Sequence, residues 1–210
     1  MRFTTPLSYL FGGLLIAIIL VLSAAGPRSA FAHGGSHAGP VVKQMGKEAA
    51  LEATLPKSAK SIKKIVAVDQ EAVMWAEETY GVRLKKGIYS YFIAQDEQSG
   101  ETIGGAVVRR SPFRQGRLSL AVGLDAERQV TNVALISINK NYFFELEESI
   151  SKGIISTYRG MSIAQITNAK ELSFSNKTQQ QFAVALRDAT VLLATLMNST
   201  QQNSDEEVGG

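Results

Sequence analysis

One long apolar stretch near the C-terminus constrains the fold more than any other part of the chain. Residues 172–197 (LSFSNKTQQQFAVALRDATVLLATLM) begin with a polar turn and continue into apolar side chains that recur every three or four positions. That spacing predicts a mostly buried helix against which the rest of the chain packs. Thr178 and Gln181 form a T-x-x-Q capping box that predicts where the helix starts. The apolar positions are Phe182, Ala185, Leu186, Ala189, Leu193, Leu196 and Met197.

The middle of the chain alternates like a set of antiparallel strands joined by short turns. In residues 117–124, large apolar side chains point one way and small ones the other, which leaves room for a helix or a flat ligand on the small face. Gly104 and Gly105 inside one stretch predict a bulge. The predicted strands are residues 64–68, 87–94, 102–109, 117–124 and 129–138.

Helical spacing recurs on both sides of these strands. Asp69 is a good N-cap for one helix, and Gly81 follows it where a left-handed residue is favoured. The helices expected in addition to the central one cover residues 41–55, 70–80 and 139–152, the last with Glu145, Glu147 and Glu148 facing outward. The elements together predict an α+β fold, an antiparallel sheet with helices packed against it.

Residues 109–117 carry four arginines in nine positions and are predicted to form a loop between two strands. Guanidinium groups in such a cluster could bind a phosphate or an acidic partner. They could equally be exposed charges that protect the neighbouring strand edges. The sequence leaves both interpretations open.

The start of the predicted central helix carries a motif. The segment S-N-K-T-Q-Q-Q-F-A-V at residues 175–184 resembles the S-G-A-T-x-[ST]-[ST]-x-A-V segment of the FMN-binding domain family, found in extracytoplasmic subunits of Rnf and sodium-pumping quinone reductase complexes. Ser175 and Thr178 match that motif. The departures are Leu172, Ser173, Asn176 and Lys177, where the family has Asp, Gly, Gly and Ala.

The resemblance covers residues 56–197 and implies an FMN-binding-domain-like fold. It implies that FMN is held by Ser175, Asn176, Lys177 and Thr178. In the family the motif threonine can carry FMN through a phosphoester bond, but the altered motif favours non-covalent binding here. Asn and Lys are bulkier than Gly and Ala beside a phosphate, although Lys could pair with it. Thr178 therefore has two possible roles, helix cap or flavin anchor.

Residues 1–32 have the form of an export signal: an early arginine, an uncharged apolar run from Leu7 to Gly26, and the A-x-A site Ala30-Phe31-Ala32. They predict export to the periplasm or another extracytoplasmic face, with a mature start at His33. An uncleaved membrane anchor is the alternative, because about 20 apolar residues can span a bilayer.

Charge and cysteine usage exclude several functions. The chain has a formal net charge of +3, but two of its basic residues and none of its acids lie in residues 1–32. A mature chain near neutrality argues against a general nucleic-acid or anionic-lipid binder. The absence of cysteine excludes cysteine-ligated iron–sulfur clusters and dithiol chemistry. His33 and His37, the only histidines, could chelate a copper-like ion or could be inert parts of a leader.

Residues 33–55 are predicted to be a leader with a short helix, and residues 198–210 a disordered tail, because the tail is polar and acidic. No nucleophile, base and orienting group occur together, so an electron-transfer or binding protein is favoured over a stand-alone enzyme. The first function is an exported FMN-binding-domain protein that holds flavin for electron transfer at or near the membrane, with a membrane redox complex or other envelope protein as partner. The alternative is a flavin-free binding or assembly protein on the same fold.

Overall fold

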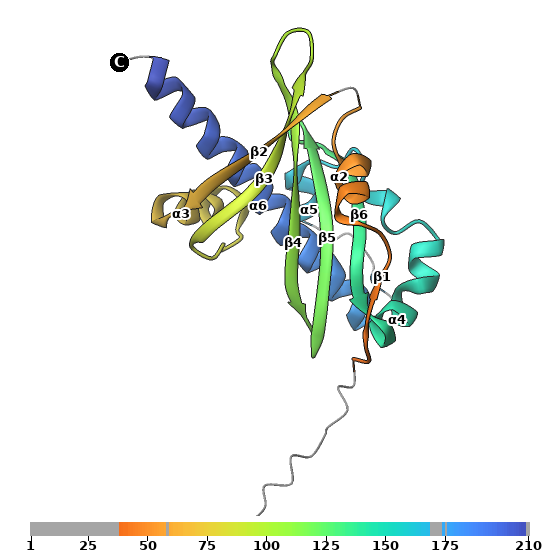
Figure 1. Ribbon diagram of the computed structural model, residues 1–210. Coiled ribbons are helices and arrows are strands. Elements are labelled where there is room, and N and C mark those ends of the chain that lie inside the picture. Colours follow the sequence, from red (N-terminus) through yellow and green to blue (C-terminus); the bar gives the residue numbers. More distant parts are fainter. Residues whose placement is uncertain (1–37, 58, 169–173, 175, 209–210) are drawn as a thin grey trace, which may run out of the picture. The chain divides into compact units, whose positions relative to one another are not determined.

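A single antiparallel sheet forms the framework of the protein, and the long apolar helix crosses behind it (Figure 1). The computed structural model describes residues 38–57, 59–168, 174 and 176–208. The prediction of an α+β fold with helices packed against an antiparallel sheet is confirmed. In chain order the elements are β1 (Val41–Lys43), α2 (Lys47–Thr54), β2 (Ala59–Val68), α3 (Gln70–Tyr80), β3 (Gly87–Asp96), β4 (Thr102–Phe113), β5 (Gly116–Asp125), β6 (Val130–Asn139), α4 (Lys140–Ser151), η1 (Ser156–Tyr158), α5 (Ile163–Thr167) and α6 (Lys177–Val208).

The six strands lie in the order β1-β6-β5-β4-β3-β2, and every neighbouring pair is antiparallel. Ala94 pairs with Gly104 and Gln95 with Thr102, which leaves Ile103 as an extra residue in β4. The predicted bulge is thereby confirmed. A Cβ on Gly104 would lie 2.4 Å from the backbone oxygen of Leu124, so the close approach of β5 requires glycine at this position.

Helix α6 packs against the large apolar side chains of the sheet, as its sequence predicts. Strand β5 supplies alternate side chains from Leu118 to Leu124, which are buried beside buried residues of α6 such as Leu186 and Leu193. Burying each such side chain stabilises the fold by about 1.5–3 kcal/mol. Residues 177–202 are long and apolar enough to cross a membrane, but 67% of the apolar window is buried inside the protein, which accounts for its composition.

Helix α2 covers the opposite face of the sheet, where β5 and β6 present small side chains. A Cβ on Gly123 would fall 1.9 Å from the backbone oxygen of Thr54, and the Thr131 hydroxyl donates a hydrogen bond to that same oxygen. Of the two occupants allowed by the small face of β5, a helix or a flat ligand, the structure places a helix there. Ala50 of α2 is fully buried against this surface.

The single helix predicted at residues 41–55 is wrong. Residues 41–43 form β1 and pair with residues 137–139 of β6, while the helix begins only at Lys47, after Gly46. The free edge of β6 offers unpaired backbone groups to this segment, and pairing with them outweighs its weak helical periodicity. The segment predicted as a leader with a short helix therefore contributes an edge strand to the sheet.

The ends of α3 follow the sequence prediction. The Asp69 carboxylate accepts a hydrogen bond from the Ala72 amide at 2.9 Å, and Gly81 adopts the left-handed conformation with φ +66°. Trp75 of this helix is half-buried and meets Tyr80 edge to face, with ring centroids 5.4 Å apart.

The prediction of disorder from Asn198 is wrong for the part of the tail that the structure describes, because α6 continues to Val208. The Tyr91 hydroxyl donates to Thr200 Oγ1 at 2.7 Å. Arg128 donates to the Ala194 carbonyl and to Gln201 Oε1, each at 2.9 Å. Polar side chains beyond the apolar run are thus held by partners on the sheet, which a search for apolar periodicity does not detect.

Candidate functional site

The first turn of α6 is capped by Asn176, not by Thr178. The Asn176 side-chain oxygen accepts a hydrogen bond from the Gln179 amide at 2.8 Å, and its amide nitrogen donates to the Glu145 carbonyl at 3.4 Å. Helix α6 begins one residue before Thr178, so the Thr178 hydroxyl points sideways toward α4 instead of along the helix axis. The predicted capping box is therefore wrong by two positions.

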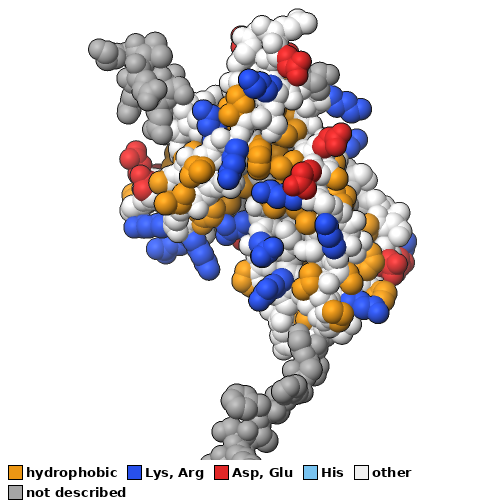
Figure 2. Space-filling model, viewed as in Figure 1, with side chains coloured by type: hydrophobic (Ala, Val, Ile, Leu, Met, Phe, Trp, Pro, Cys, Tyr) orange, Lys and Arg blue, Asp and Glu red, His pale blue; other side chains and the backbone are white. Residues whose placement is uncertain are grey.

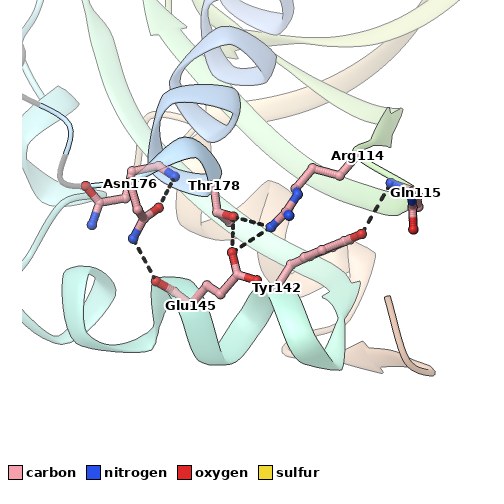
Figure 3. A network of polar contacts seen from close by, with 7 residues as sticks. Arg114, Gln115, Tyr142, Glu145, Asn176 and Thr178 are labelled. Carbon is pink, nitrogen blue, oxygen red and sulfur yellow. Dashed lines mark hydrogen bonds and ion pairs between the residues drawn. The ribbon is translucent and has the colours of Figure 1, made fainter. Parts of the chain in front are cut away.

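Thr178 instead belongs to a three-residue polar network that joins α6, α4 and the β4–β5 turn (Figure 3). Its fully buried hydroxyl donates to a carboxylate oxygen of Glu145 and accepts from Arg114 Nη1 at 2.8 Å. The same Arg114 nitrogen lies 2.7 Å from the Glu145 carboxylate. Both charged side chains are partly exposed, at 31% for Arg114 and 44% for Glu145, so water screens this ion pair.

Arg114 reaches the network because the hairpin between β4 and β5 is very tight. The predicted arginine loop at 109–117 is wrong, since β4 runs to Phe113 and β5 starts at Gly116. Arg114 has a positive φ of 53°, a backbone conformation that costs a non-glycine residue about 1 kcal/mol or more and is often found at binding sites. Of the four arginines, only Arg114 contacts Thr178 among the described interactions.

Tyr142 of α4 packs against the Arg114 guanidinium group. Its ring centroid lies 4.7 Å from the Arg114 guanidinium carbon, and its hydroxyl accepts a hydrogen bond from the Gln115 amide at 3.3 Å. Phe113 meets the same ring edge to face at 5.7 Å. These contacts hold the guanidinium group in one place, because cation–π and edge-to-face packing act on the same ring.

A hollow of about 520 Å³ opens beside the network. Gln181 lies on its wall, and its Oε1 atom is buried without a hydrogen-bond partner among the described residues. Buried polar atoms are nearly always paired, so Gln181 Oε1 is an acceptor that a group bound in the hollow can use. The hollow is lined by Arg114, Gln115, Tyr142, Glu145, Lys177 and Gln181.

The structure brings together most of the predicted site. Lys177 is exposed and lines the hollow, Thr178 is buried behind it, and Asn176 caps the helix. Ser175, as well as His33 and His37, lies outside the described residues. Two positive side chains, Arg114 and Lys177, and one carboxylate line the hollow at the positive end of a helix dipole, so the hollow favours an anion.

Glu145 is the functional residue that sequence reasoning missed. Its side chain is predicted to point outward, but its carboxylate turns in to bind Thr178 and Arg114. It directly precedes Leu146, which is fully buried, so it lies at the border of the helix's buried stripe. That position is the one sequence signal that could have identified it. Among the described residues, no group of three or more His, Cys, Asp or Glu side chains could hold a metal ion.

The chain matches no family model, no curated protein and no solved structure.

Proposed function

We propose that this chain is an exported protein with an FMN-binding-domain-like fold that holds FMN non-covalently in the hollow at the start of α6. The observation that carries the proposal is the coincidence of two independent features at one place. Lys177, in the segment that resembles the motif, lines the hollow next to the buried motif threonine Thr178, and the β4–β5 turn brings Arg114 to the same point.

The side chains around the hollow suit a phosphate. Arg114 offers guanidinium donors, Lys177 offers an ammonium group, and both lie at a helix N-terminus, where anions are favoured by about 0.3–1 kcal/mol. Gln181 Oε1 can accept a hydrogen bond from a hydroxyl or N–H group of the same ligand. The volume of about 520 Å³ is in the range of small-molecule pockets.

A covalent phosphoester on Thr178 does not suit the same geometry. The hydroxyl is fully buried and has both a carboxylate acceptor and a guanidinium donor. Esterification would remove the proton that Glu145 accepts and would place a phosphate against that carboxylate, where like charges repel. This argument supports non-covalent binding.

In this proposal FMN supplies the electron-transfer chemistry, as cofactors do, and the chain supplies binding and position. Arg114 and Lys177 hold the anionic group, and Tyr142 fixes the direction of the guanidinium. Glu145 limits the positive charge of the site and keeps Arg114 directed at Thr178 in the absence of ligand. Electrons would pass to or from a membrane redox complex or another envelope protein.

Comparing FMN with riboflavin tests the proposal, because riboflavin lacks the phosphate. We expect protein recovered from the envelope to quench the fluorescence of added FMN and to bind riboflavin more weakly. Arg114→Gln removes a charged hydrogen-bond donor worth about 1.5–3 kcal/mol and should weaken FMN binding about tenfold or more. Arg110→Gln, an exposed arginine of the same hairpin that does not line the hollow, is the matched control and should bind FMN like the parent.

The flavin-free binding or assembly protein is the second candidate, and the position of Glu145 favours it. The Glu145 carboxylate already binds the Thr178 hydroxyl and the Arg114 guanidinium, so it competes with an incoming phosphate for both groups. If neither FMN nor riboflavin binds to the parent protein or to a Glu145→Gln variant, the flavin-free function replaces the first. Equal affinity for FMN and riboflavin, unchanged by Arg114→Gln, would instead show that the phosphate site is misplaced.

A further inference from the structure

The adjacent strands β2 and β3 expose two large apolar side chains on the face of the sheet turned away from α6. Ile88 is 78% exposed and Ile65 is 67% exposed, more than any other large apolar side chain in the described part of the chain. Helix α2 lies over β4, β5 and β6 and leaves these two isoleucines uncovered. Single exposed apolar residues are common, but two on adjacent strands of a rigid sheet call for an explanation.

The strand register places these side chains on one face. Ala67 pairs with Ile88, and Ile65 lies two residues before Ala67, so Ile65 and Ile88 are diagonal neighbours on the same side. Lys63 pairs with Phe92, four residues along each strand from the Ala67–Ile88 pair, and therefore shares this side as well. The Lys47 ammonium of α2 lies 5.5 Å from the Phe92 ring centroid, which identifies this side as the α2 side of the sheet.

Several basic side chains lie near the isoleucines. Arg110 follows Ala106, the partner of Phe92, by four residues, so its exposed side chain is on the α2 side too. Lys85 and Lys86 are exposed directly before β3. None of Lys63, Lys85, Lys86 and Arg110 forms an ion pair within the described residues. Figure 2 shows the α2 side, where hydrophobic side chains over β2 and β3 are bordered by Lys and Arg and acidic side chains are fewer. We call Lys63, Ile65, Ile88 and Arg110 the basic–apolar face.

We propose that the basic–apolar face docks on the surface of a bilayer that contains anionic phospholipids. Branched apolar side chains enter the headgroup boundary, while basic side chains around them meet the phosphate groups, and an anionic bilayer supplies both environments side by side. The net charge of the mature chain argued against an anionic-lipid binder, but the charges are spread unevenly, and a local cluster is sufficient for surface attraction.

Other binding partners fit the basic–apolar face less well. A second copy of the chain would bring the same positive charges against each other. An acidic protein would satisfy the charges and is kept as an outcome of the test.

The chain has no cysteine, so one introduced cysteine gives a unique labelling site. In the full chain as recovered from the envelope, Ile88→Cys carries a polarity-sensitive fluorophore. Vesicles contain phosphatidylcholine alone or mixed with phosphatidylglycerol, with brominated lipid as the quencher. Phe144→Cys is the matched control, because Phe144 is also exposed, on α4, with the Lys140 ammonium 5.6 Å from its ring centroid.

We expect a blue shift and quenching for the Ile88→Cys label on mixed vesicles, little change on phosphatidylcholine alone, and none for the Phe144→Cys label. Lys63→Gln and Arg110→Gln should each weaken vesicle binding about fivefold, since one basic side chain near an anionic surface is worth about 1 kcal/mol. These side chains are exposed, so thermal melting should be unchanged. Equal quenching of both labels, or of neither, overturns the proposal. A shift of the Ile88→Cys label with polyglutamate but not with vesicles also overturns it and assigns the face to an acidic protein.

Discussion

Tyr158 offers a mutation that should make the protein more stable by removing a polar atom. The side chain is only 1% exposed, and its hydroxyl has no hydrogen-bond partner among the described residues. An unpaired buried hydroxyl costs about 1–3 kcal/mol in lost hydration. Tyr158→Phe keeps the ring and deletes the oxygen, so we expect the free energy of unfolding to rise by about 1 kcal/mol and the melting temperature by about 3 °C.

Tyr91→Phe is the matched control. Tyr91 is also buried, but its hydroxyl donates to Thr200 Oγ1 at 2.7 Å. Deleting that oxygen removes a hydrogen bond and leaves the threonine with one partner fewer. We expect a loss of about 1 kcal/mol, opposite in sign to the effect at Tyr158.

The pH dependence of stability provides a second readout at Tyr158. Burial raises the pKa of its phenol from 10.0 to about 12. The unfolded chain releases this proton at about pH 10 and the folded chain only at about 12. The raised pKa therefore contributes to the free energy of unfolding in full below pH 10. This contribution, about 3 kcal/mol in total, is lost as pH rises toward 12. Tyr158→Phe should lack this part of the alkaline loss.

Urea unfolding followed by the fluorescence of Trp75, the only tryptophan, measures both effects at neutral and alkaline pH. The reasoning would be refuted if Tyr158→Phe lowered stability as much as Tyr91→Phe does. The Tyr158 hydroxyl would then have a partner in the folded protein. An unchanged alkaline loss in Tyr158→Phe would show that other groups produce it.

Four other predictions concern the central helix, its contact with Glu145 and the N-terminus. Leu193→Asp places an unpaired charge at a fully buried position, so we expect no cooperative melting transition; a variant that melts like the parent would mean that α6 is exposed. Asn176→Ala removes the observed helix cap, so the free energy of unfolding measured in urea should fall by about 1 kcal/mol. Thr178→Val should lower the free energy of unfolding of the parent but not that of a Glu145→Gln variant, because Thr178 and Glu145 act as one unit. N-terminal sequencing of protein from the native envelope should give His33 as the first residue, whereas Met1 would identify an anchored chain.

Elements with a strong local signal could be predicted from the sequence. The 3.6-residue period of the central helix, the cap at Asp69 and the left-handed Gly81 all depend on neighbours within a few positions. The pairing of residues 41–43 with β6 could not be predicted in this way, because it depends on a free strand edge far along the chain. The same holds for Thr200 and Gln201, whose partners Tyr91 and Arg128 lie on other elements.

The candidate site was predicted in part for the same reason. Motif resemblance located Lys177 and Thr178, and arginine density drew attention to the segment that contains Arg114. Nothing local indicates that the Arg114 turn and α6 meet, since Arg114 and Thr178 are 64 positions apart. Glu145 was missed because helical periodicity assigns a whole side chain to one face, whereas a long carboxylate at the border of two faces can reach either.

The pairing of β1 with β6 would set an order for folding if the chain is exported as we propose. The Asn139 side chain donates to the Gly39 carbonyl across 100 positions of sequence, and β1 pairs with the strand that ends at Asn139. If the chain crosses the membrane from its N-terminus, its first structured segment emerges long before its partner strand exists. That segment stays unpaired until β6 has crossed the membrane, and contacts between such distant parts of a chain form slowly. Until then, β1 and α2 are accessible to chaperones and proteases, and the pairing of β6 with β1 is the step that ends this exposure.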